Sequence, residues 1–200
     1  MTKICVMVSG NGTTLQAIID AVKNKKIDVE ISKVIADREC LAIKRAEDNN
    51  IPYRILKRGE YFQRDLKEEM RSSKCDFFVL AGFLSIIGKE ITDEFRYRII
   101  NTHPSLLPCF GGHGFYGRKV HEAVIKSGMK YSGCTVHFVT DEVDGGPIIL
   151  QRCVSVEDVD DAQSLEEKIH GIEHSAIVEA ISLLSNGHYK IEGKRVILNM

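Results

Sequence analysis

Two spacings of apolar residues alternate along the first half of the chain. Apolar residues crowd together in four short runs, which we expect to form β-strands: 3–8, 29–36, 52–57 and 76–83. Between these runs they recur every three or four positions, which predicts helices over 13–22, 41–50 and 60–74. The last run is apolar throughout, as in a central strand covered on both faces. Strands that alternate with helices in this way predict a parallel sheet with right-handed crossovers.

The second half of the chain predicts a different pairing of strands. A helix over 119–128 ends at a glycine, and two strands follow it at 134–140 and 147–156. Because only the short stretch "DEVDGG" separates these two strands, we expect them to form an antiparallel edge.

A long amphipathic stripe then predicts the last helix. We expect this helix to start at a Ser164-x-x-Glu167 capping box and to end at Asn186-Gly187. The remaining segment, 188–199, has the pattern of a terminal hairpin.

Length and composition narrow the class of protein. With 200 residues and no internal repeat or low-complexity linker, the simplest prediction is a single domain over 1–200. A formal net charge of -1 and scattered basic residues argue against binding to nucleic acid or to an anionic membrane. The six cysteines lie far apart, which favours reduced thiols. No apolar segment approaches the roughly 20 residues of a membrane span. We therefore expect a cytoplasmic protein. The sequence leaves the oligomeric state open.

A glycine-bearing loop, "SGNGTTLQ" at 9–16, connects the first strand to the first helix. Backbone N–H groups at a helix N-terminus favour an anion, and glycines let a phosphate approach the backbone. Gly10-x-Gly12-x-x-Leu15 lacks the third glycine of a dinucleotide fingerprint, and no Gly-Lys-Ser/Thr follows. The loop therefore fits either a phosphomonoester site or a plain turn in which Thr13 caps the helix.

An asparagine and a histidine stand directly after the apolar run "YRII". Asn101 and His103 point to the same side if the chain is still extended there. An asparagine can donate to a developing oxyanion, and a histidine can shuttle a proton near neutral pH. If Asp144 of the acidic turn lies against His103, it would raise the pKa of the imidazole. A structural hydrogen-bonded pair and a solvated turn are the alternatives.

Other chemistry-bearing residues give weaker signals. His170 and His174 are spaced for one helix face but lack the adjacent glutamate of a zinc-protease helix, and no metal is expected. Cys109 lies near His103 without an orienting third group. The segment 109–117 holds four glycines in nine residues and has the composition of a mobile loop or lid.

Taken together, these segments resemble one enzyme family, the phosphoribosylglycinamide formyltransferases, which are folate-dependent enzymes of purine synthesis. The similarity extends over almost the whole chain, and five blocks carry it in the family's order: "SGNGTTLQAII" (9–19), "VLAGFLSII" (79–87), "NTHPSLLP" (101–108), "GCTVHFVTDEVDGGPIILQ" (133–151) and "EH" (173–174).

The resemblance implies an α/β fold of the Rossmann-like formyltransferase type. Such a fold has a mostly parallel central sheet, helices on both faces and an antiparallel edge. It would place a phosphate-binding half at about 1–100 and a catalytic and folate-binding half at about 76–185.

The resemblance also implies the reaction, which is formyl transfer from 10-formyltetrahydrofolate to the amine of 5-phosphoribosylglycinamide. Asn101, His103 and Asp144 match the family's catalytic trio. The residues that match the ribonucleotide contacts are Gly12, Thr13, Thr14 and Glu173. The residues that match the folate contacts are Leu84, Ser85, Ile86, Ile87, Asn101, Thr140, Asp141 and Asp144.

Three features depart from the family pattern. Thr14 stands where many relatives have asparagine, Ser85 stands where some have arginine, and the glycine-rich loop after Pro108 is several residues longer. Arg58 is a candidate for a basic residue that contacts folate in some members.

Two other functions remain as alternatives. A formyltetrahydrofolate hydrolase would have no use for the phosphate loop, and its relatives carry an additional regulatory domain. A folate- or nucleotide-binding module would need a pocket but not the trio of Asn101, His103 and Asp144. A tRNA formyltransferase would carry a further basic domain, and this chain is not basic.

Overall fold

The structure is a computed structural model, and it describes residues 1–198. The chain divides into two compact units, one from Met1 to Asn101 and the other from Thr102 onward. Each unit is described separately. Over the described residues, no helix has the length and apolar character needed to cross a membrane.

The first unit is built on parallel strands in the order β3-β2-β1-β4-β5. Their bounds are β1 (Thr2–Val8), β2 (Val29–Ala36), β3 (Tyr53–Ile55), β4 (Phe77–Leu80) and β5 (Ile99–His103), the last of which runs across the unit boundary. The strand order turns back after β3, so the crossovers before and after β3 leave the sheet on opposite faces. This arrangement confirms the parallel α/β sheet that the apolar periodicity predicts.

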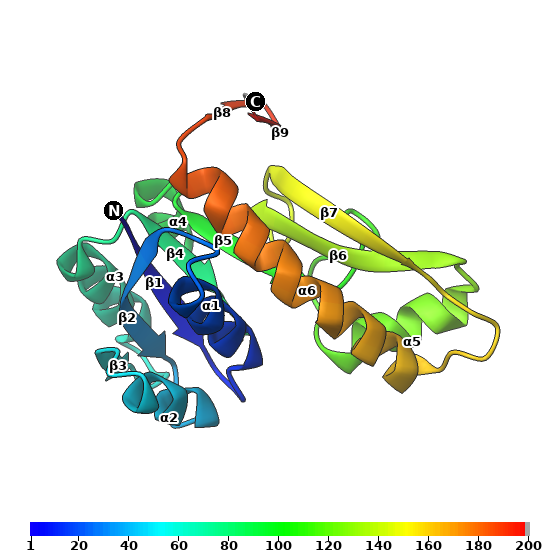
Figure 1. Ribbon diagram of the computed structural model, residues 1–200, viewed down its shortest axis with the longest axis horizontal. Coiled ribbons are helices and arrows are strands. Elements are labelled where there is room, and N and C mark those ends of the chain that lie inside the picture. Colours follow the sequence, from blue (N-terminus) through cyan, green and yellow to red (C-terminus); the bar gives the residue numbers. More distant parts are fainter. Residues whose placement is uncertain (199–200) are drawn as a thin grey trace. The chain divides into compact units, whose positions relative to one another are not determined.

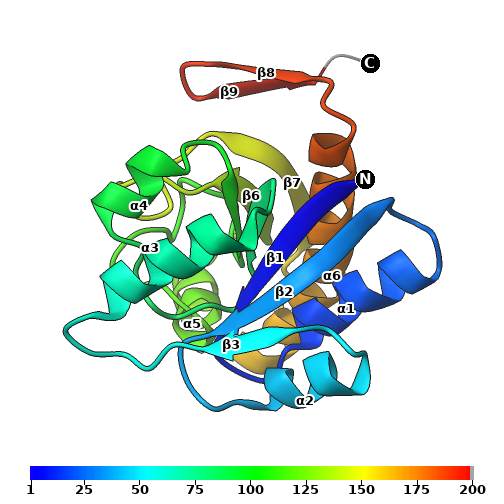
Figure 2. The ribbon, with the colours of Figure 1, turned by 90° about the vertical axis from the view of Figure 1, so that its left-hand side faces the viewer.

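The helices of the first unit cover both faces of its sheet. Figure 2 shows α1 (Thr13–Lys23) and α2 (Leu41–Asp48) on one side of β1 and β2, with α3 (Phe62–Ser73) on the other. A short helix, α4 (Lys89–Glu94), follows β4. Because it lies between two covering layers, β1 is buried from Ile4 through Val8. Burial on both faces explains why its sequence shows no polar alternation.

The second unit pairs its strands mainly antiparallel. β6 (Tyr131–Phe138) and β7 (Ile148–Ser155) form a long antiparallel pair, as predicted. β9 (Arg195–Leu198) joins β7 in parallel and β8 (Tyr189–Glu192) in antiparallel pairing, which confirms the terminal hairpin up to residue 198; residue 199 lies outside the described residues. Figure 1 shows α6 (Ala162–Ser185) lying along β6 and β7, beside α5 (Arg118–Ser127).

Three local predictions require correction. The strands predicted at 52–57 and 76–83 shorten to the three-residue β3 and the four-residue β4, and α4 has no counterpart among the predicted elements. Its six residues are too few for an apolar period to emerge.

All six cysteines are free thiols, in agreement with the reduced state predicted from their spacing.

The start of α6 also differs from the prediction. Its N-cap is Asp161, whose carboxylate accepts hydrogen bonds from the backbone N–H groups of Gln163 (2.9 Å) and Ser164 (2.8 Å). Ser164 completes the capping box from the third helical position by accepting from the N–H of Asp161 at 3.0 Å. The predicted box at Ser164 and Glu167 is therefore wrong by three residues, because an aspartate caps as well as a serine does.

Replacing the cap should destabilise the protein measurably. We expect Asp161→Ala to lower the free energy of unfolding by about 1 kcal/mol, since two N–H groups lose their acceptor. Urea unfolding followed by circular dichroism would measure the change. The matched control is Glu167→Ala, which removes only a contact from the Gln163 side chain. An equal loss in both variants would contradict the cap at Asp161.

Candidate active site

Strand β5 carries the first two candidate residues. The strand stays extended through His103, so Asn101 and His103 lie within it rather than after it and project from the same face. Pairing of Asn101 with Leu80 of β4 holds this end of the strand in the sheet of the first unit. The imidazole of His103 is buried, with 4% of the residue exposed.

Asp144 contacts His103 within the second unit. Its Oδ2 lies 3.4 Å from Nδ1 of the imidazole. The other ring nitrogen, Nε2, lies 2.8 Å from the carbonyl oxygen of Phe110, which can only accept a hydrogen bond. Nε2 therefore carries a proton, and in the neutral ring Nδ1 presents its lone pair toward Asp144. The backbone N–H of Gly112 donates to the same Oδ2 at 3.0 Å.

A second histidine, for which the sequence gave no role, also faces Asp144. Nε2 of His137 lies 3.6 Å from Oδ1 of the carboxylate, and the residue is buried in β6. The signal in the sequence was a histidine inside the apolar run "CTVHFVT", seven positions before the aspartate. Asp144 thus lies between two imidazoles, one on each oxygen.

Burial and charge together set the protonation of this cluster. Burial lowers the pKa of His103, and although Asp144 and the Phe110 carbonyl oppose the shift, the net pKa lies below the ordinary histidine value. The expectation that Asp144 would raise this pKa overall is wrong, because desolvation outweighs the nearby charge. Burial would raise the pKa of Asp144, yet His137, His103 and the Gly112 N–H hold it below its usual range. These shifts favour the neutral form of His103 and the ionised form of Asp144, and the contact between Nδ1 and Oδ2 becomes a hydrogen bond when Nδ1 gains a proton.

A tight turn brings Asp144 to the histidines. Asp144 adopts a left-handed backbone conformation with φ of 56°. A Cβ atom on Gly146 would lie 1.8 Å from the carbonyl oxygen of Phe138, so this position accepts only glycine. Of the other two residues in the turn with carboxylates, Glu142 pairs with Lys194 at 3.1 Å and Asp141 is exposed. Thr140 donates to the backbone of Glu142 and helps to close the turn.

The glycine-rich segment 109–117 contacts the cluster through its backbone. The Phe110 carbonyl contacts His103, and the Gly112 N–H contacts Asp144. Within the segment, the rings of Phe110 and Phe115 pack edge to face with their centroids 6.0 Å apart. Any motion of the segment as a lid would break the two backbone contacts to the catalytic pair. The lid stays a prediction.

Glu173 occupies a separate place in the second unit, on helix α6. Its Oε1 accepts a hydrogen bond from Oγ1 of Thr102 at 3.3 Å. Burial raises the pKa of the Glu173 carboxyl to about 7, and the hydrogen bond from Thr102 only partly offsets this effect. The nearby rings of His170 and His174 stack edge to face at 4.3 Å. In the range 1–198, no cluster of three or more His, Cys, Asp or Glu residues could hold a metal ion.

The glycine loop of the first unit forms the N-terminus of α1. Gly12 is the N-cap, with φ of 71°, so the interpretation of Thr13 as the cap is wrong; Thr13 and Thr14 are the first two helical residues. A Cβ atom on Gly12 would lie 2.6 Å from Cβ of Ala42 in α2. Nε of Arg45, also in α2, donates to the carbonyl of Asn11 at 2.8 Å. Helix α2 therefore holds the loop in place.

The segment 84–87 follows β4 and exposes apolar side chains. Leu84 is 57% exposed and Ile86 is 63% exposed, whereas Ile87 is buried. Ser85 points inward, and its hydroxyl donates to Oδ2 of Asp37 at 2.6 Å. Asp37, which sequence reasoning did not identify, also accepts from the guanidinium of Arg58.

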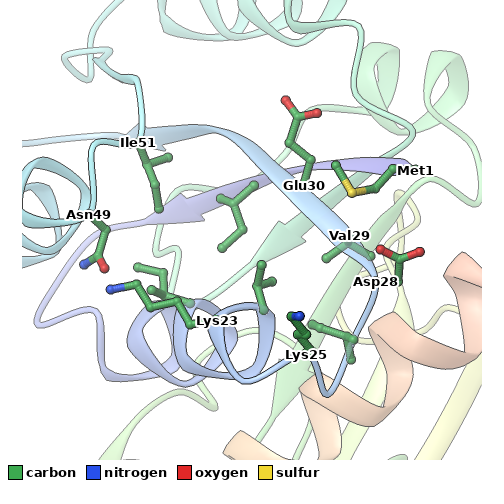
Figure 3. Close-up of a pocket in the computed structure, with 12 residues that line it drawn as sticks. Met1, Lys23, Lys25, Asp28, Val29, Glu30, Asn49 and Ile51 are labelled. Atoms are coloured by element: carbon green, nitrogen blue, oxygen red, sulfur yellow. The ribbon is translucent and has the colours of Figure 1, made fainter.

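A pocket lies at the other end of the same sheet. Figure 3 shows it beside the start of β2, where Met1, Val29 and Glu30 line it together with Lys23 and Lys25. In the first unit, the glycine loop and the segment 84–87 instead follow the carboxyl ends of the parallel strands β1 and β4, where open α/β sheets bind ligands. This pocket contains none of the predicted site residues.

Comparisons with known proteins agree with this geometry. A family model described as formyl transferase matches residues 2–181. A chloroplastic phosphoribosylglycinamide formyltransferase of Vigna unguiculata is 37% identical over 91% of this chain, which spans 60% of the length of that protein. Glycinamide ribonucleotide transformylase 1 of Symbiobacterium toebii superposes with a TM-score of 0.92 at 36% identity, covering 99% of this chain and 94% of that one. A formyltetrahydrofolate deformylase of Pseudomonas syringae shares the fold at 22% identity and a TM-score of 0.90, covering 99% and 66% of the two chains.

The raised pKa of Glu173 leads to a prediction of how the stability of the protein depends on pH. Because its pKa is raised in the folded protein, the folded state binds an extra proton between about pH 4.5 and 7, and stability falls as the pH rises through this window. We expect Glu173→Gln to stabilise the protein above pH 7, by roughly 2 kcal/mol, and to leave it nearly unchanged near pH 5. Chemical unfolding of both proteins at pH 5 and pH 8 would measure this. A gain of equal size at both pH values would contradict the raised pKa.

Proposed function

The chain belongs to the formyl transferase family, and from this premise we propose that it transfers the formyl group of 10-formyltetrahydrofolate to the amine of 5-phosphoribosylglycinamide. The observation that carries the proposal is the contact of the ionised, buried Asp144 with His103, on the strand that also presents Asn101. A formyl transfer between nitrogen atoms needs a donor for an oxyanion and a group that moves one proton. Asn101 and His103 supply these functions.

Binding of the ribonucleotide is assigned to two segments. The N-terminus of α1 at Gly12, Thr13 and Thr14 would hold the ribose phosphate through backbone N–H groups and the positive end of the helix dipole. Glu173 would accept hydrogen bonds from the glycinamide part. In the free protein the pKa of Glu173 is raised. A donor group of the ligand favours the charged carboxylate, so binding of the ribonucleotide would lower this pKa.

Binding of the folate is assigned to the segment 84–87 and to the turn around Asp144. The exposed side chains of Leu84 and Ile86 offer apolar area to a flat ring, and backbone groups of both segments can pair with its polar edge. Thr140 and Asp141 would complete the folate contacts of the turn.

The neutral resting state of His103 suits the proton transfer. When the neutral amine attacks the formyl carbon, its nitrogen becomes cationic and the formyl oxygen becomes anionic. Asn101 donates to the oxygen, while His103 can accept the proton that the attacking nitrogen must lose. The imidazolium is then stabilised by Asp144 and by the oxyanion, and it returns the proton to the departing folate nitrogen. One proton leaves the amine and one reaches the folate, so the residues end unchanged.

A direct assay tests the proposed reaction. Purified protein is mixed with 10-formyltetrahydrofolate, and loss of the formyl group is followed with and without 5-phosphoribosylglycinamide. We expect release only in the presence of the amine, because water is a poor substitute for a positioned nucleophile. Release without the amine would establish a hydrolase instead, and folate binding without any release would leave a binding module.

The role of His103 gives a sharper prediction. We expect His103→Ala to lower kcat by a factor of about 10²–10³, the usual loss when a group that stabilises the transition state is removed. The matched control is His188→Ala, which removes an exposed histidine next to β8 and should retain full kcat. Circular dichroism would show whether both variants fold. Near-normal turnover in a folded His103→Ala protein would overturn the mechanism.

A further inference from the structure

We propose that Asp37 is a positioning residue that fixes the folate-binding segment and Arg58 in the first unit. The proposal rests on the proposed function, because it concerns how one substrate of that reaction is held. Asp37 touches neither reacting group; it acts through the residues that it orients.

The carboxylate of Asp37 is fully enclosed by donors. Its side chain has no exposed area, and Oδ2 accepts from Nη2 (2.5 Å) and Nε (2.9 Å) of Arg58 and from the hydroxyl of Ser85 (2.6 Å). Oδ1 accepts from Nε of Arg38 at 3.1 Å. A buried carboxylate is stable only with such a set of partners, so each donor is held in one geometry.

These donors come from different loops. Asp37 follows β2, Arg58 follows the neighbouring β3, and Ser85 follows β4, which lies on the other side of β1; all three are at the carboxyl ends of parallel strands. Ser9, which follows β1, accepts from the backbone N–H of Leu84 at 2.8 Å. The Ser9 hydroxyl and the Asp37 carboxylate therefore anchor the start of the segment 84–87, while the side-chain amide of Gln63 donates to the carbonyl oxygen of Ile86 at 2.8 Å.

Electrostatics agrees with this arrangement. Burial would raise the pKa of Asp37, but hydrogen bonds from Ser85, Arg38, Ser9 and Arg58 bring it below its usual value. The carboxylate is therefore charged across the working pH range. Two arginines, whose side chains are 40% and 45% exposed, share this single negative charge, so the cluster keeps a net positive charge beside the segment.

The glycine loop contacts Asp37 through its first residue, Ser9, but the rest of the loop has a separate anchor, which makes the role of Asp37 selective. The carbonyl oxygens of Gly10 and Asn11 accept from the backbone N–H of Ala42 (3.1 Å) and from Nε of Arg45 (2.8 Å), both in helix α2. Losing the charge of Asp37 should therefore loosen the segment 84–87 more than it loosens the phosphate loop. In kinetic terms, the KM for the folate should rise while the KM for the ribonucleotide changes little.

Asp37→Asn tests this expectation, since it keeps the shape and removes the charge. We expect the KM for 10-formyltetrahydrofolate to rise about 10-fold or more, while kcat and the KM for 5-phosphoribosylglycinamide stay within about 3-fold. Ser85→Ala, which leaves both arginines paired, should give a smaller rise and serves if Asp37→Asn does not fold.

The matched control is Glu94→Gln. It breaks another pair in the first unit in which a carboxylate accepts from two nitrogens of one arginine, here Arg71. This control should change no kinetic parameter. Equal changes in both KM values, or a loss of thermal stability with an unchanged folate KM, would overturn the positioning role.

Direct binding separates this inference from the proposed function. Titration of tetrahydrofolate into the wild-type protein and into Asp37→Asn, followed by intrinsic fluorescence or calorimetry, measures folate affinity without turnover. If the wild-type protein shows no transfer but binds the folate more tightly than the variant, the proposed reaction fails and the role of Asp37 stands. Equal affinities would overturn the role of Asp37 even if the wild-type protein is active.

Discussion

A carboxylate that is withdrawn from water must be surrounded by groups that stabilise its charge, and each unit of this protein is organised around one such carboxylate. In the first unit, Asp37 accepts from donors in the loops after three strands of the parallel sheet, β2, β3 and β4. In the second, Asp144 collects His103, His137 and a backbone N–H. In both cases the partners have little freedom to move. The same enclosure that makes the charge costly therefore gives precise placement of the surrounding side chains.

Burial has a second consequence in the catalytic pair. A solvated histidine beside an aspartate would be protonated more readily, but at His103 the loss of solvent prevails and the ring rests neutral. A neutral ring is ready to accept a proton, and it gains its charge only when the oxyanion and the ammonium form. In the proposed reaction, Asp144 would then stabilise a charge that exists during the reaction and is absent before it. Its electrostatic contribution would be directed at the transition state, as efficient catalysis requires.

Sequence reasoning captured what depends on chain-local patterns. The apolar runs gave the parallel strands, the short "DEVDGG" turn gave the antiparallel pair, and the run "YRII" placed Asn101 and His103 at the end of a strand, where their catalytic role stays a prediction. It missed Asp37, because its partners Arg58 and Ser85 lie 21 and 48 positions away along the chain. It missed His137, because no local spacing relates this residue to Asp144, 7 positions away. It also gave the wrong direction for the pKa of His103, since charges can be read from a sequence but the depth of burial cannot.

The position of Ser85 shows how a local departure can fit the same site. An arginine at position 85 would bring its own charge to the segment 84–87. The Ser85 hydroxyl instead donates inward to Asp37. The positive charge belongs to Arg58 on another loop, which is held by the same carboxylate and by the Ser85 hydroxyl. Asp37 thus couples the two positions, because Ser85 and Arg58 donate to one oxygen, and Arg58 also donates to the Ser85 hydroxyl. A change at either residue alters the partners of the other, so the two positions form one functional unit.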